Sequence, residues 1–123
     1  MSPADPLALV FSTAPDEKVA QTLSQALVTE GLAACVTALP GATSTYAWEG
    51  QLQTSSEVQL LIKTSAARLP RLEERLCALH PYGVPEFLTV DISGGLPAYL
   101  DWIREGVSRE PDPDQSDPSE SKP

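Results

Sequence analysis

The chain has 123 residues, which is enough for one domain with one core and too few for two. Its hydrophobic content of 41% and charged content of 20% are typical of a folded globular domain. A net charge of −9 argues against nucleic acid or an anionic membrane as a partner, because both would repel the protein. The N-terminal apolar run is short and has no lysine or arginine before it, so it predicts no secretory signal. With two cysteines and no such signal, we expect reduced thiols and a cytoplasmic location.

The first elements in the chain are a predicted strand and a predicted helix. The apolar run LALVFST, residues 7–13, is typical of a buried strand. Thr13 is the expected N-cap of the helix that follows, with acidic residues in its first turn. Gly31 is expected to end that helix as the residue after the cap. The core stripe of the helix is Val19, Leu23 and Leu27, together with Ala20 and Ala26.

Two strands joined as a hairpin are predicted next. The second strand begins with LAACVTAL, and PGATS (residues 40–44) should bend or bulge it, because proline donates no ladder hydrogen bond. TYAWEGQLQ predicts a hairpin with Glu49 and Gly50 near its tip. EVQLLIKT returns as the third strand, and one of its faces carries Val58, Leu60 and Ile62.

A second helix follows, with Ser65 as its expected cap and Leu69, Leu72, Leu76 and Leu79 as its core stripe. Arg68, Arg71 and Arg75 share another face, which is predicted to be solvated and paired with Glu73 and Glu74. The stretch ALHPYGVPEF should end the helix, because Pro81 disfavours helical geometry at His80.

The last predicted elements are a fourth strand, FLTVDI, and a helix over residues 96–107. The packing side chains expected on that helix are Tyr99, Leu100, Trp102 and Ile103. Residues 108–123 are acidic and rich in proline and serine, so we expect a disordered tail after a domain that comprises residues 1–107.

This order of elements predicts an α+β, ferredoxin-like split βαβ fold with a four-stranded antiparallel sheet, two helices on one face and a C-terminal helix. The central β-hairpin, residues 33–64, is too long for so small a sheet, and its outer half should project past the core. An isolated hairpin is marginal in water and exposes unpaired strand edges. We therefore predict an oligomer built by sheet extension.

The chain resembles the CutA family of divalent-cation tolerance proteins across nearly all of residues 7–107. The resemblance rests on five stretches in order: LAACV (32–36), PGATSTYAWEGQL (40–52), SEVQLLIKT (56–64), LHPYGVPEF (79–87) and PAYLDWI (97–103). It implies a tight homotrimer, a link to copper or another divalent cation that folding does not require, and a cleft between subunits. The cleft residues that it implies are Trp48, Glu57, Lys63, His80, Tyr82 and Glu86, and the implied metal ligands are Cys35 and His80.

The resemblance also suggests an alternative, because the implied trimer is similar to the PII signalling proteins. In that interpretation the protein is a trimeric module for signalling or for binding a small ligand or a partner. The sequence departs from the family pattern at Gly83, where an acidic residue is common, and also at Gln51 and Thr45.

Metal binding and catalysis can both be weighed from the residues. Cys77 and His80 are spaced i, i+3, and sulfur with imidazole suits copper or zinc. Both thiols are nevertheless expected to be buried as small hydrophobic groups, Cys77 beside the leucine stripe and Cys35 in a strand. No nucleophile elbow or oxyanion signature is present, so we predict that the protein is not an enzyme.

Overall fold

The computed structural model describes residues 5–108, and the predicted acidic tail lies outside this range. Within this range the chain forms four strands and three α-helices, with one short 3₁₀ turn at Ala66–Arg68. The elements run in the order β1 (Leu7–Ala14), α1 (Glu17–Thr29), β2 (Cys35–Trp48), β3 (Gln51–Ser65), α2 (Leu69–Leu79), β4 (Leu88–Ile92) and α3 (Pro97–Ser108).

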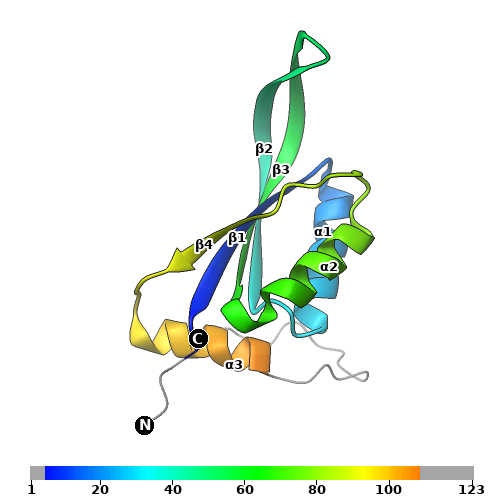
Figure 1. The fold of residues 1–123 in the computed structure, drawn as a ribbon. Coiled ribbons are helices and arrows are strands. Elements are labelled where there is room, and N and C mark those ends of the chain that lie inside the picture. Colours follow the sequence, from blue (N-terminus) through cyan, green and yellow to red (C-terminus); the bar gives the residue numbers. More distant parts are fainter. Residues whose placement is uncertain (1–4, 109–123) are drawn as a thin grey trace.

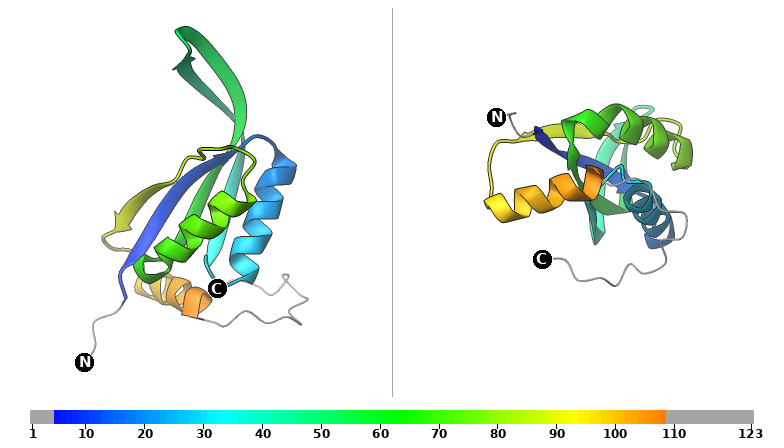
Figure 2. Two further views of the ribbon diagram at one scale, coloured as in Figure 1. Left: turned by 45° about the vertical axis from the view of Figure 1, so that its right-hand side comes forward. Right: turned by 90° about the horizontal axis from the view of Figure 1, so that it is seen from below.

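The four strands form one antiparallel sheet in the order β2-β3-β1-β4, which confirms the predicted ferredoxin-like plan. Helices α1 and α2 lie side by side against one face of this sheet (Figures 1 and 2). The core between these two layers contains twelve buried residues. They are Val10, Ala14, Ala20, Leu23, Leu27, Leu32, Ala33, Val58, Leu60, Ile62, Leu72 and Leu76.

Helix α3 packs against the opposite face of the sheet (Figure 2). The Lys63 side chain alternates with the buried Ile62 along β3, and its Nζ lies 5.8 Å from the centre of the Tyr99 ring on α3. Ile103 and Val107 are buried on α3, although neither belongs to the main core cluster. None of the helices within residues 5–108 is long and apolar enough to span a membrane.

The hairpin of β2 and β3 extends well beyond the other elements as a projecting arm (Figure 1). Its turn has two residues, Glu49 and Gly50, with φ of 51° and 78°, as the sequence predicted. The ladder is irregular between Leu39 and Ala42, which confirms the bulge predicted at the proline. We call residues 42–57, which lie beyond this bulge, the arm.

Both predicted helix caps are wrong. Thr13 belongs to β1, and Asp16 caps α1 by accepting a hydrogen bond of 2.8 Å from the Val19 N–H. Asp16 takes this position because β1 continues to Ala14 and Pro15 follows it directly. The Ser65 side chain makes no capping hydrogen bond, because the backbone first forms the 3₁₀ turn.

The sequence predicted a solvated face of arginines on α2, but two of these arginines bind partners on other helices. Arg75 forms a two-pronged ion pair with Glu30 at the end of α1, with Nε 2.9 Å from Oε1. The Arg68 Nε donates to the carbonyl of Val107 at the end of α3. These two side chains join helices that lie far apart in the sequence.

Candidate functional site

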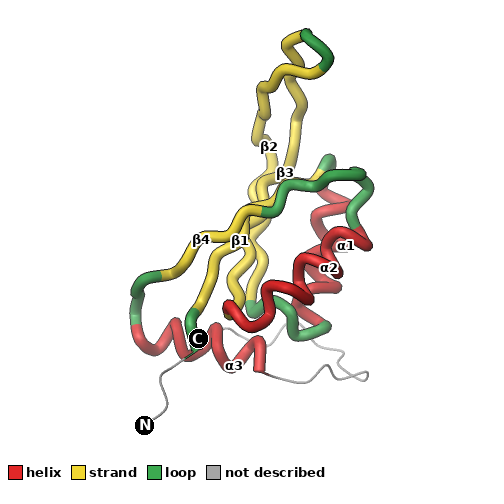
Figure 3. The backbone as a smooth tube through the Cα atoms, in the orientation of Figure 1, coloured by secondary structure: helices red, strands yellow, loops and turns green. Residues whose placement is uncertain are grey.

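The stretch that ends α2 and leads to β4, residues 80–87, is called the connector here. It crosses the end of β1 as a loop (Figure 3). Strand β4 pairs with β1 only from Leu7 to Phe11, so the last residues of β1 have no strand neighbour on that side. The connector lies at this end of β1 instead, where the Ser12 hydroxyl donates to the Glu86 carbonyl at 2.7 Å.

His80 is the C-cap residue of α2 and has extended backbone geometry, with ψ of 139°, as the following proline predicts. Its side chain is buried, with the residue 7% exposed. One ring nitrogen, Nδ1, accepts the Tyr82 N–H at 3.1 Å, and the other, Nε2, lies 2.7 Å from the Thr13 carbonyl oxygen. Since Nδ1 accepts, Nε2 carries the proton and donates. Both ring nitrogens are therefore used by the backbone.

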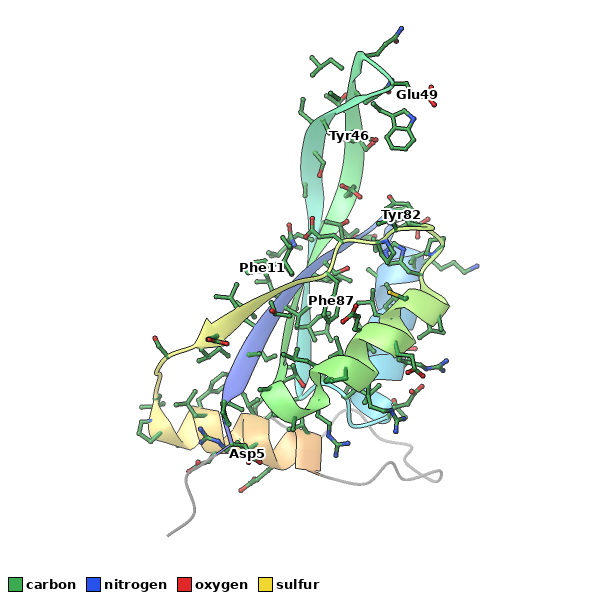
Figure 4. The ribbon with its side chains drawn as sticks, in the orientation of Figure 1. Asp5, Phe11, Tyr46, Glu49, Tyr82 and Phe87 are labelled. Atoms are coloured by element: carbon green, nitrogen blue, oxygen red, sulfur yellow. The ribbon has the colours of Figure 1, made fainter. Side chains whose placement is uncertain are left out.

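Tyr82 stands beside this histidine, with ring centroids 4.7 Å apart. Its hydroxyl donates to the Glu57 carboxylate of β3 at 3.1 Å. Burial and then the hydrogen bond that Tyr82 donates to Glu57 raise the pKa of the Tyr82 phenol above its ordinary value. Figure 4 shows Tyr82 on the connector, at the level where the arm leaves the sheet. His80, Tyr82 and Glu57 thus form one polar cluster at the base of the arm.

The other predicted cleft residues lie elsewhere in the chain. Trp48 is 63% exposed at the end of the arm and pairs with Gln51 of β3. Gln51 is six residues from Glu57 along the strand, a distance of about 20 Å. Lys63 lies six residues from Glu57 in the other direction and contacts Tyr99. Glu86 belongs to the connector, and its backbone carbonyl accepts the hydrogen bond from Ser12 of β1. One chain therefore brings together Glu57, His80 and Tyr82, but neither Trp48 nor Lys63.

The two implied metal ligands are also apart within one chain. Cys35 lies opposite Lys63 of β3, and Lys63 in turn lies opposite Leu9 of β1. His80 bonds to Thr13, which is four residues or about 13 Å further along β1 than Leu9. Among residues 5–108, no three or more His, Cys, Asp or Glu side chains are grouped so that they could hold a metal ion. The expected burial of both thiols is wrong, since Cys77 is exposed and Cys35 is half-buried. Cys77 follows the buried Leu76 directly and so turns away from the core.

The sheet face on which α3 packs is covered only in part, and the exposed apolar side chains on it were not predicted. Leu39, Leu88 and Val90 are 48%, 59% and 47% exposed, although all three belong to or adjoin the sheet. Phe11 pairs with both Leu88 and Leu61, on the face opposite Val10 and Ile62. The signal was available in the sequence, because LALVFST and QLLIK are apolar at consecutive positions, which is typical of strands covered on both faces.

A shallow groove of about 330 Å³ lies between α1 and the outer edge of β2. Its lining is mostly apolar, and its charged side chain is Glu17. The lining residues are Glu17, Ala20, Gln21, Ser24, Val36, Ala38, Pro40 and Val58. The groove is separate from the polar cluster of His80, Tyr82 and Glu57.

The fold and these surfaces define a class of protein: a ferredoxin-like α+β domain with a projecting arm, a partly uncovered sheet face and a polar cluster at the base of the arm. The family model of the CutA1 divalent ion tolerance protein matches residues 8–106. The chain therefore belongs to the CutA1 divalent ion tolerance protein family.

Individual relatives agree with this assignment. The divalent-cation tolerance protein CutA of Thermus thermophilus is 50% identical over 99 residues, covering 80% of this chain and 96% of the relative. The crystal structure of CutA from Xylella fastidiosa has a TM-score of 0.81 and 53% identity, covering 85% of this chain and 99% of that one. The crystal structure of CutA1 from Oryza sativa has a TM-score of 0.83 and 39% identity, covering 85% of this chain and 96% of that one.

Proposed function

We propose that this chain is a non-catalytic divalent-cation tolerance protein that works as a homotrimer. The observation that carries the proposal is the match of nearly the whole described domain to the CutA1 family. Assembly of several copies is supported by the exposed Leu39, Leu88 and Val90 on the sheet face that α3 covers only in part, because a monomer gains by burying such a patch against another copy. The projecting arm supplies unpaired strand edges for the same assembly.

Sedimentation equilibrium with paired variants tests the assembly. Leu88→Asp places a charge on the open face, whereas Thr89→Asp places one on the other face of the same exposed strand. We expect wild type and Thr89→Asp to sediment with three times the mass of one chain and Leu88→Asp to dissociate. A wild-type protein that stays monomeric at micromolar concentration would refute the trimer.

Metal binding in this assembly is proposed through Cys35, with copper as the favoured ion. A closed site does not form within residues 5–108 of one chain, and His80 already uses both ring nitrogens. Cys35 is half-buried on the side of the sheet that faces away from α1 and α2, so thiols from more than one copy can meet there. Thiolate is a soft ligand that suits copper(I).

Copper(I) titration against a competing chelator tests this assignment in the full chain. We expect Cys35→Ser to lose affinity and Cys77→Ser, the exposed thiol, to behave as wild type. His80→Gln should also retain the affinity if Cys35 is the ligand and His80 is not. Equal affinity in Cys35→Ser and Cys77→Ser would show that binding is adventitious.

A PII-like role as a small-ligand or signalling module is the second candidate function. The groove between α1 and β2 favours it, because a largely apolar hollow with a few polar groups suits a small organic ligand. The cytoplasmic location remains a prediction, since a solved relative from Archaeoglobus fulgidus, 31% identical with a TM-score of 0.79, is described as periplasmic.

A further inference from the structure

The polar cluster at the base of the arm connects three segments of the chain, which are the end of β1, the connector and β3. His80 joins the end of β1 to the connector, through the Thr13 carbonyl and the Tyr82 N–H. Tyr82 then joins the connector to β3 through Glu57. The three hydrogen bonds are 2.7–3.1 Å long. The histidine is buried, so water cannot readily replace the hydrogen bonds that its ring makes.

Glu57 occupies a particular place in the hairpin. It pairs with Ala42, which is the first residue of β2 after the irregularity that begins at Leu39. A bulge bends its strand and raises the local twist, so the direction of everything beyond it depends on contacts made there. The Tyr82 hydroxyl meets the arm at this first pair, so it acts as a strut at the hinge between the sheet and the arm.

We propose that His80 is a positioning residue, which holds Tyr82 against Glu57 and thereby fixes the direction in which the arm leaves the sheet. The rest of the connector supports the same alignment, because the Ser12 hydroxyl holds the Glu86 carbonyl and the Gln59 side chain holds the Ser12 carbonyl at 2.8 Å. The contacts that carry this role lie within one chain and leave Cys35, the proposed metal ligand, untouched.

Two conservative variants separate the two hydrogen bonds of His80. In His80→Gln the amide reaches the position of Nε2 and can donate to the Thr13 carbonyl, but the acceptor for Tyr82 is lost. In His80→Asn the carbonyl oxygen takes the position of Nδ1 and can accept from the N–H two residues on, as asparagine does in an Asx-turn. The two variants therefore keep opposite halves of the link.

The readout is the nuclear magnetic resonance spectrum of the full chain, labelled with ¹⁵N and ¹³C. The Overhauser contact between the Tyr82 ring and the Glu57 side chain reports the strut, and residual dipolar couplings of arm amides report the direction of the arm. We expect His80→Asn to keep both signals. His80→Gln should raise the population with Tyr82 detached about fivefold, which corresponds to the loss of one ordinary hydrogen bond.

The outcomes separate positioning from a structural role in the core. If His80→Gln and His80→Asn affect the arm couplings equally, or neither affects them, the proposal is wrong. Tyr82→Phe provides the second test, because it leaves both hydrogen bonds of His80 in place and removes only the strut. It should shift the arm couplings while the couplings of α1 and α2 stay fixed. Unchanged arm couplings in Tyr82→Phe would overturn the proposal even if both His80 variants failed to fold.

Discussion

Helix α3 approaches the rest of the molecule closely at Gly106, and Gly106→Ala tests that packing. A Cβ atom there would lie 2.8 Å from the Cβ of Ala34 and 3.1 Å from its Cα. Since carbon atoms pack at about 3.5–4.0 Å, α3 would have to move away by about 0.7 Å or more. Ala34 itself cannot yield easily, because its N–H donates to the Lys63 carbonyl at 2.8 Å.

Two opposing terms set the magnitude of this effect. Replacing glycine by alanine in a helix gains about 1 kcal/mol of stability from propensity. Overpacking a close contact costs about 1–3 kcal/mol. We therefore expect Gly106→Ala to be neutral or destabilising by up to about 2 kcal/mol, instead of stabilising as helix propensity alone would predict.

A double-mutant cycle with Ala34→Gly isolates the contact, because it removes the opposing Cβ. Urea unfolding at one fixed protein concentration should give a favourable coupling free energy of about 1–2 kcal/mol between the two changes. Gly94→Ala is the control, since nothing lies within 4 Å of its added Cβ. Additive effects of Gly106→Ala and Ala34→Gly would refute the close approach of α3.

Three further predictions concern other contacts. A cycle of Glu30→Gln and Arg75→Met should show a coupling of only about 0.5 kcal/mol that falls with salt, because these side chains are 31% and 41% exposed; a salt-independent coupling would contradict this. Glu57→Gln should lower the pKa of Tyr82 in a titration read against Tyr82→Phe. Because the folded pKa is raised, Tyr82 contributes full stability below its unfolded pKa, and wild type should lose stability more steeply than Glu57→Gln as pH rises above about 10. Gly50→Ala should cost about 1–2 kcal/mol through its φ of 78°, as measured by urea unfolding, whereas Gly83→Ala should cost little.

Local sequence patterns predicted the helices, strands and turn well, because each pattern is compatible with one kind of secondary structure. The leucine stripe of α2, the face of Val58, Leu60 and Ile62, and the turn at Glu49 and Gly50 all lie where they were expected. The cap predicted at Thr13 was wrong because the end of β1 is set by its pairing with β3, which continues to Ala14 opposite Val58. Periodicity along one segment carries no information about such pairing.

The site was harder to predict because its contacts are between segments far apart in the sequence. The resemblance placed Trp48, Glu57, Lys63, His80, Tyr82 and Glu86 in one implied cleft between subunits. In one chain, pairing register separates Trp48 and Lys63 from Glu57 by about 20 Å each. The hydrogen bond between Tyr82 and Glu57 spans 25 residues and could not be read from spacing.

The single histidine shows how backbone requirements can explain a residue that looks functional. Buried backbone groups need partners, and the end of β1 projects past β4, so the Thr13 carbonyl has no neighbouring strand to bond on that side. Pro81 and Pro85 lack N–H groups and cannot supply the missing donor. An imidazole at position 80 offers one donor and one acceptor, and so satisfies Thr13 and Tyr82 together. A metal ion would have to displace one of these bonds, so the metal proposal rests on Cys35 and the arm proposal rests on His80.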